Sequence, residues 1–394
     1  MLKKIIKDSL YKNSLYLIIN SILISLFGFI FWNITTKLFT MEQVGIATTL
    51  ISAQSIIGLL ASLGFSTSII RFYSKIEKKD ELINNSIILN TIFSLIVGTI
   101  FILGISIFSP KLSITPSQKI IFILSSSIWT LFSTTNSIFI AQKKSKLVLV
   151  KNLIFSITKL ILPFTFVTLG AYGIFNSLNI ATLLSLTFTL LIIKYKPKFK
   201  LNKEIIKNTL KFSLSNHLSS VFNTSFGYVT PLIITNLINP ETTALFYIPW
   251  MIGNILFFIP IAVSQSFLAE NSHNDKSNIK KSLKFTYLLT IPSVVFTIII
   301  SKYLLIFFKP EYAKATLFLQ LISISTLFYS YNTIKNASLS IKHKNKQLII
   351  SNLIIAITSI TLTILLINKG LIGIAIAWIT SQIICCFYLI LQKQ

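Results

Sequence analysis

Two cationic side chains lie inside long apolar segments of this sequence, Lys159 near the middle of one and Arg71 near the end of another. An ionisable group in hydrocarbon is costly, and it usually faces a cavity or a partner. An ammonium offers three donors, and a guanidinium can hold a phosphate with two. We therefore expect both residues to contact an anionic substrate. Local water or a carbonyl around Lys159, or interfacial anchoring of Arg71, is the alternative.

The acidic residues have the opposite distribution. All ten lie in predicted loops or at the ends of apolar segments, and none lies at mid-membrane: Asp8, Glu42, Glu77, Asp80, Glu81, Glu204, Glu241, Glu270, Asp275 and Glu311. An exporter of organic cations normally binds its substrate or coupling ion through a buried carboxylate. Buried cations without buried carboxylates favour an anionic substrate.

Three further polar residues are candidate substrate contacts. Asn136 and Asn336 occupy matching places in two apolar segments, where they can hydrogen-bond sugar hydroxyls or hold helices together. Lys335 lies close to a predicted cytoplasmic end, where anchoring in the interface is the alternative role. The sequence has no glycine-rich phosphate loop, metal-ligand cluster or nucleophile triad in a long loop. We therefore expect neither catalysis nor a cofactor.

The composition requires a lipid environment for these residues. Hydrophobic residues make up 53% and charged residues 12%, whereas soluble proteins carry about 25% charged residues. The net charge of +26 suggests nucleic-acid binding at first, but the lysines lie in short loops between apolar segments. The positive-inside rule explains that distribution, so no nucleic-acid partner is expected.

The apolar segments predict about twelve membrane-spanning helices, because each approaches or exceeds the roughly 20 residues that a span needs. The expected ranges are 13–35, 44–70, 84–108, 119–141, 147–169, 172–193, 208–238, 242–268, 284–308, 315–340, 347–367 and 370–391.

Lysines mark alternate loops and so predict the orientation. Every internal loop of one set is lysine-rich, whereas the other set holds only Lys37, Lys111, Lys119, Lys302, Lys309, Lys314 and Lys369. The positive-inside rule places the rich set, and with it both termini, in the cytoplasm.

The sequence also repeats itself at an offset of about 200 residues. The segment 152–158 is similar to 352–358, and Gly170 and Gly173 are matched by Gly370 and Gly373. Two halves that start on the same side predict parallel six-helix repeats, 1–200 and 201–394, with the substrate path between them.

The stretch from Met41-Glu42-Gln43-Val44-Gly45 through Leu63-Gly64-Phe65 to Ile70-Arg71-Phe72 resembles the polysaccharide biosynthesis flippases. Val44 stands where these proteins usually have an aromatic residue. The resemblance places the chain in the multidrug/oligosaccharidyl-lipid/polysaccharide exporter superfamily, in its O-antigen-type (Wzx-type) branch, with a MATE-like, all-α integral membrane fold.

The resemblance implies a function in surface-glycan biosynthesis. The substrate would be an oligosaccharide on a polyprenyl phosphate or diphosphate, flipped from the cytoplasmic to the outer leaflet of the cell membrane. Membrane lipids, a glycan polymerase and glycosyltransferases are the implied partners. A multidrug exporter is the main alternative, disfavoured by the missing buried carboxylates. A membrane-embedded polymerase or ligase, or a structural membrane protein, is less consistent with the short loops and with Lys159.

The lysine distribution makes a direct prediction about topology. Cysteines introduced at Lys144, Lys198 and Lys344 should react with a membrane-impermeant thiol reagent only from the cytoplasmic side, and cysteines at Thr115 and Lys369 only from outside. Labelling of position 198 from outside would contradict the twelve-span arrangement with parallel repeats.

Overall fold

The computed structural model describes residues 9–193, 201–271 and 279–392, and this part of the chain forms helices joined by short turns. The first six predicted spans correspond to α2 (Ser9–Leu38), α3 (Met41–Ala61) with α4 (Phe65–Phe72), α5 (Lys79–Leu103) with α6 (Ile105–Phe108), α7 (Pro116–Ala141), α8 (Ser145–Thr165) and α9 (Ala171–Ile193). The other six correspond to α10 (Lys203–Leu237), α11 (Pro240–Asn271), α12 (Ile279–Phe308), α13 (Thr316–Ile341), α14 (Asn345–Leu365) and α15 (Gly370–Leu391). The predicted all-helical membrane fold is confirmed.

Nine of the described helical segments are long and apolar enough to cross a membrane. The three that fall short are α7, α10 and α13, which are rich in serine, threonine and asparagine. In α7 the hydroxyls of Ser126, Thr130 and Thr134 are buried and donate to carbonyls one turn earlier, at 2.7 to 2.8 Å. These hydroxyls are satisfied within their own helix, so α7 can carry them inside the protein.

The second predicted span is not one continuous helix, contrary to the range 44–70. Leu63 (φ 44°) and Gly64 (φ 75°) adopt left-handed backbone conformations that separate α3 from α4. Gly64 also approaches Ser213 of α10 so closely that a Cβ there would collide with the Ser213 carbonyl. Apolar residues on both sides of the break hide it from a hydropathy pattern.

Packing divides the chain into two compact units. The boundary in the sequence lies inside α10, where the first unit ends at His217 and the second begins at Leu218. The start of α10 is attached to the first unit by a paired hydrogen bond. The backbone N–H of Asn202 donates to Asn85 Oδ1 at 3.0 Å, and Asn85 Nδ2 donates to the Asn202 carbonyl at 3.0 Å. The Asn202 side chain also accepts from the N–H groups of Glu204 and Ile205, which caps the helix.

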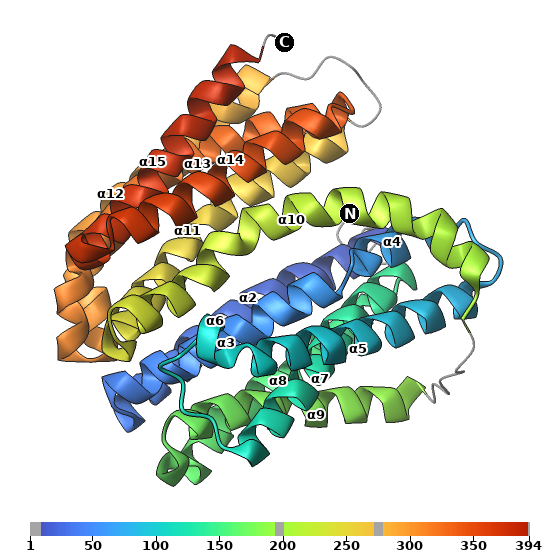
Figure 1. The fold of residues 1–394 in the computed structure, drawn as a ribbon. Coiled ribbons are helices and arrows are strands. Elements are labelled where there is room, and N and C mark those ends of the chain that lie inside the picture. The colour runs from blue at the N-terminus through green and yellow to red at the C-terminus, as the bar shows by residue number, and fades with distance from the viewer. Residues whose placement is uncertain (1–8, 194–200, 272–278, 393–394) are drawn as a thin grey trace. The chain divides into compact units, whose positions relative to one another are not determined.

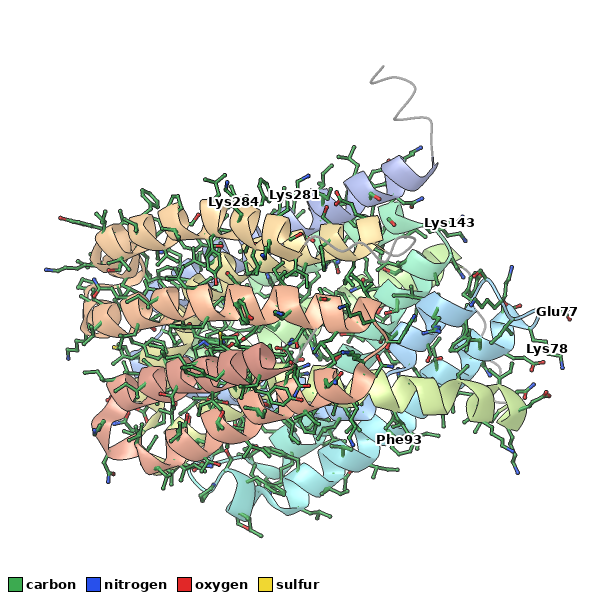
Figure 2. All side chains as sticks on the ribbon, turned by 90° about the horizontal axis from the view of Figure 1, so that it is seen from above. Glu77, Lys78, Phe93, Lys143, Lys281 and Lys284 are labelled. Carbon is green, nitrogen blue, oxygen red and sulfur yellow. The ribbon has the colours of Figure 1, made fainter. Side chains whose placement is uncertain are left out.

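Within the N-terminal unit, helices run side by side (Figure 1). Helix α7 packs against α3, α4, α5, α8 and α9, and α8 packs extensively on α2 and α9. Glu77, Lys78 and Lys143 lie at the same end of this unit, so the turns before α5 and before α8 share one end (Figure 2). Both turns belong to the predicted lysine-rich set.

Within the C-terminal unit, α13 packs against α11, α12 and α15, and α14 packs against α15. The backbone conformations confirm that the sequence repeat is structural. Gly170 and Gly370 have φ values of 56° and 58°, and Lys143 and His343 have φ values of 57° and 53°. Helices α7, α8 and α9 of the first unit therefore correspond to α13, α14 and α15 of the second.

Candidate functional site

One face of α8 carries a row of buried residues, several of them polar. Its buried side chains follow the three- and four-residue spacing of a single helix face: Ser145, Val148, Lys151, Asn152, Phe155, Ser156, Lys159 and Pro163. Two of these residues are lysines, eight positions apart. The helix therefore holds two cations along one inward-facing row.

Lys159 is 5% exposed, and its ammonium lies over two aromatic rings. The Nζ atom is 4.9 Å from the ring centre of Phe155 and 5.6 Å from that of Phe31 on α2. Within the described residues it has no hydrogen bond or ion pair, so its three donors lack acceptors. A desolvated cation–π contact gives about 2 kcal/mol, whereas burying an ion costs several kcal/mol. The two rings alone do not offset this cost, and an anion beside Lys159 would.

Lys151 is buried more deeply, but the protein satisfies its charge. Its side chain is 1% exposed, and Nζ donates to the carbonyl of Phe132 at 2.5 Å and to Thr135 Oγ1 at 2.8 Å. The Phe132 ring centre lies 3.7 Å from Nζ. Lys151 therefore ties α8 to α7. Lys151 was not among the predicted site residues, although its spacing of eight residues from Lys159 was an available signal.

Three aromatic rings connect the surroundings of the two lysines. The ring centres of Trp129 and Phe132 are 5.8 Å apart, and those of Phe132 and Phe155 are 5.3 Å apart. Phe132 faces Lys151, and Phe155 faces Lys159. The negative faces of these rings stabilise the cations, and they leave Lys159 its full donor capacity.

The two predicted asparagines have different surroundings. Asn336 Oδ1 accepts from Ser351 Oγ at 2.8 Å, which joins α13 to α14. At the position equivalent to Ser351 the first unit has Lys151, which bonds to Phe132 and Thr135 instead. Asn136 Oδ1 is consequently buried without a hydrogen-bond partner in the described structure. Asn336 acts as an interhelical link, whereas Asn136 keeps an acceptor available.

Another pair of asparagines performs the same structural role in both units. Asn152 donates to Asn20 Oδ1 at 2.8 Å, and Asn352 donates to Ser219 Oγ at 2.6 Å. Each bond links the fifth helix of a repeat to its first. This shared contact belongs to the scaffold of the repeat, whereas the two buried lysines of α8 are particular to the first unit.

The remaining predicted site residues lie elsewhere. Arg71 is exposed in the last turn of α4, with its guanidinium 5.8 Å from the Phe72 ring centre. Lys335 is half-buried on α13 in the C-terminal unit, 5.9 Å from the ring centre of Tyr331. Among the described residues, no cluster of three or more His, Cys, Asp or Glu side chains forms a candidate metal site.

Comparison with solved structures identifies the fold class. The lipid II flippase MurJ in an inward closed conformation matches with a TM-score of 0.75 at 20% identity, over 96% of this chain and 86% of that one. An inward-facing multidrug resistance MATE family transporter of the MOP superfamily gives 0.67 at 14%, over 90% and 92%. A MOP superfamily transporter from Pyrococcus furiosus gives 0.61 at 13%, over 97% and 94%. The chain has the fold of this transporter superfamily.

A family model identifies the family within that class. The model described as "Polysaccharide biosynthesis protein" matches residues 10–262, which is well over half of the chain. The chain therefore belongs to the polysaccharide biosynthesis protein family, as the resemblance around Arg71 predicted. A search of curated proteins found no match.

The different surroundings of the two buried lysines predict opposite effects on stability. Lys151→Met should lower the free energy of unfolding by about 1–3 kcal/mol, because it leaves buried acceptors unpaired. Lys159→Met should leave stability unchanged or raise it, because it removes a buried charge without a protein acceptor. Thermal unfolding in detergent compares the two variants. Equal destabilisation would mean that the protein itself satisfies Lys159.

Proposed function

We propose that this chain flips an oligosaccharide linked to a polyprenyl phosphate or diphosphate across the membrane, and that Lys159 contacts the phosphate during the passage. The observation that carries the proposal is the environment of Lys159. Its ammonium is buried near the middle of α8 between two rings, with no acceptor among the described residues. Phosphate oxygens supply both the negative charge and the acceptors that this group lacks.

The mechanism we propose is alternating access. The headgroup carries a fixed negative charge, and its transfer through hydrocarbon is too costly without a compensating cation. Opening of α2 away from α8 would expose Lys159, because Phe31 of α2 is one of the two rings that cover it. Asn136 on α7 would bond a sugar hydroxyl through its unpaired Oδ1, and Asn336 on α13 would do so in exchange for its contact with Ser351. Arg71, exposed at the end of α4, would attract phosphate at the cytoplasmic entrance.

The acidic residues support an anionic substrate. Among the described residues, no Asp or Glu is buried. The ion pairs formed there, Lys78–Glu81 at 4.0 Å and Lys309–Glu311 at 3.8 Å, lie at helix ends. A cavity lined by lysine and without carboxylates repels organic cations, because charges interact strongly in a low dielectric.

The comparisons are consistent with this substrate class. MurJ is described as a lipid II flippase, and the work on the Pyrococcus furiosus transporter states that its binding pocket has reverse polarity, which suggests a different function. For our chain we propose flipping from the cytoplasmic to the outer leaflet of the cell membrane, with both termini cytoplasmic. We further propose two functional halves, 1–200 and 201–394, no catalytic activity, and glycan polymerases or glycosyltransferases as functional partners.

The test is a cell assay of surface glycan alongside an assay of resistance to ethidium-like dyes. Wild type should restore surface glycan in a flippase-deficient strain without conferring dye resistance. Lys159→Met should reduce this complementation at least about a hundredfold, which corresponds to losing one charge-assisted contact of about 3 kcal/mol. Lys146→Met, on an exposed lysine of the same helix, is the matched control and should complement normally.

Two outcomes would overturn the proposal. Dye resistance with unchanged surface glycan would assign the chain to drug export, the alternative that the MATE neighbours represent. Normal complementation by Lys159→Met, at wild-type protein levels, would remove Lys159 from the transport path.

A further inference from the structure

A small hollow lies in the C-terminal unit, lined by residues from the start of α12, the end of α13, the start of α14 and the end of α15. Its lining includes Lys335, Ser338, Lys342, Lys344 and Gln392, and Ile279 forms an apolar wall. The volume is about 20 Å³, and a single water needs about 10–15 Å³. The hollow therefore admits about one water-sized group, such as a single oxygen of a larger anion at its mouth, and it is too small for a sugar chain.

Three of the lining residues are lysines, and no acidic residue lines the hollow. Lys335 and Lys344 are half-buried and Lys342 is exposed, and none of the three has an ion pair with any described residue. Lysines gathered in this way repel one another. An anion between them removes that repulsion.

Ser338 gives an independent indication of a ligand. Its side chain is 4% exposed, lines the hollow, and makes no hydrogen bond with any described residue. Elsewhere on α13, Ser325 and Ser330 donate to carbonyls of their own helix at 2.6 and 2.7 Å. A buried hydroxyl normally has a partner. The Ser338 hydroxyl instead faces the hollow with its hydrogen-bonding capacity unused.

The start of α14 adds further donors. Lys344 is the residue that precedes the first turn of α14, and no side chain caps this helix end. The first N–H groups of a helix have no partner within the helix, and together with the helix dipole they favour an anion. Lysine side chains and a serine side chain thus line one hollow beside the start of α14.

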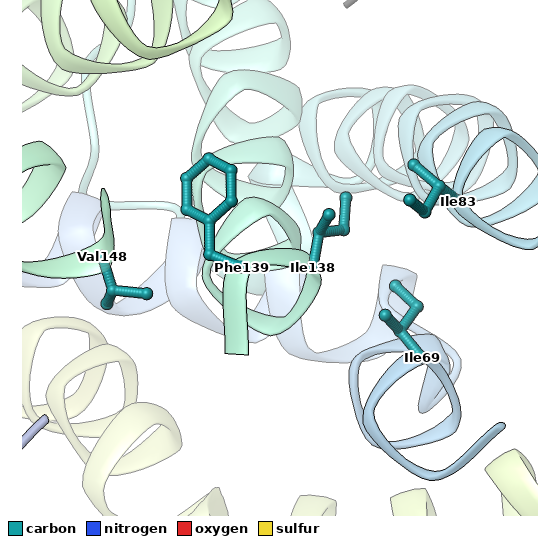
Figure 3. Packing of buried hydrophobic residues seen from close by; sticks show 5 residues of the cluster. All are labelled: Ile69, Ile83, Ile138, Phe139 and Val148. Carbon is teal, nitrogen blue, oxygen red and sulfur yellow. The ribbon is translucent and has the colours of Figure 1, made fainter. Parts of the chain in front are cut away.

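The first unit has different residues at the equivalent position. There the equivalent of Ser338 is Ile138, which packs with Ile69, Ile83, Phe139 and Val148 in an apolar cluster (Figure 3). The equivalents of Lys335 and Lys342 are Thr135 and Gln142. The equivalent of Lys344 is Lys144, so the first unit keeps one of the three lysines and has an apolar side chain in place of the serine.

We propose that this hollow is a binding site for a phosphate group carried by an anionic lipid. The hollow opens on the lysine-rich side, which the positive-inside rule assigns to the cytoplasm. Basic pockets between helix ends on that side attract anionic headgroups. The phosphate comes from a phospholipid headgroup or from a polyprenyl phosphate, which share this chemistry. The site does not involve Lys159, so the proposal stands without the proposed transport function.

The test measures retention of lipid by the full chain in detergent, using native mass spectrometry. The probes are phosphatidylglycerol, a polyprenyl phosphate and, as the zwitterionic reference, phosphatidylcholine; inorganic phosphate is tested by thermal shift. Lys342→Gln combined with Lys344→Gln should weaken binding about thirtyfold, since each lysine near the membrane surface contributes about fivefold. The matched control is Lys280→Gln with Lys346→Gln, which removes the same charge from exposed lysines outside the hollow.

Ser338→Ile provides a test that keeps every charge, because it places the isoleucine of the first unit in the hollow. It should abolish retention while the lysines remain. Preferential loss of phosphatidylglycerol identifies a phospholipid site, and preferential loss of polyprenyl phosphate identifies a carrier site. A response to inorganic phosphate without lipid retention, or equal weakening in the lysine pair and its control, would overturn the proposal.

Discussion

The cost of holding an ammonium group in a low-dielectric interior determines how the N-terminal unit is organised around α8. The unit buries two ammonium groups, and it stabilises them in different ways. Lys151 has a carbonyl, a hydroxyl and a ring within reach, and so joins α8 to α7. Lys159 has only the rings of Phe31 and Phe155. The same helix thus carries a cation that the fold needs and a cation that an outside anion would stabilise.

The comparison of the two repeats separates scaffold from specialisation. The turn glycines Gly170 and Gly370 and the amide contacts of Asn152 and Asn352 recur 200 residues apart. The buried lysines do not recur, since Ser351 and Ser359 stand at the positions of Lys151 and Lys159. The first unit has Lys151 on its fifth helix facing Thr135 on its fourth, whereas the second has Lys335 on the fourth and Ser351 on the fifth. The two repeats therefore share one scaffold and differ in where their lysines lie.

The amino-acid sequence was sufficient to predict the twelve spans, because long apolar runs and alternating lysine-rich loops determine where helices begin and end. The sequence also predicted that Lys159 lies inside the membrane-spanning part of the protein, because it is far from both ends of its apolar segment. The break at Leu63 and Gly64 was not predicted because both sides of it are apolar. The hydrogen-bond partners of Lys151, or the lack of partners for Asn136 and Ser338, could not be predicted either. Each depends on which side chain of a neighbouring helix lies opposite, and a single sequence does not contain that pairing.

The central proposal is that the positive charge at position 159 stabilises the phosphate of the substrate during transport. The most direct measurement is charge rescue of Lys159→Cys, in a chain with Cys385 and Cys386 replaced by serine, reconstituted in proteoliposomes with a polyprenyl-diphosphate oligosaccharide. After complete modification, confirmed by mass, an aminoethyl thiosulfonate should restore flipping, and a hydroxyethyl reagent of similar size should not. Equal rescue by the neutral reagent would contradict the account, because it would show that position 159 requires volume and not charge.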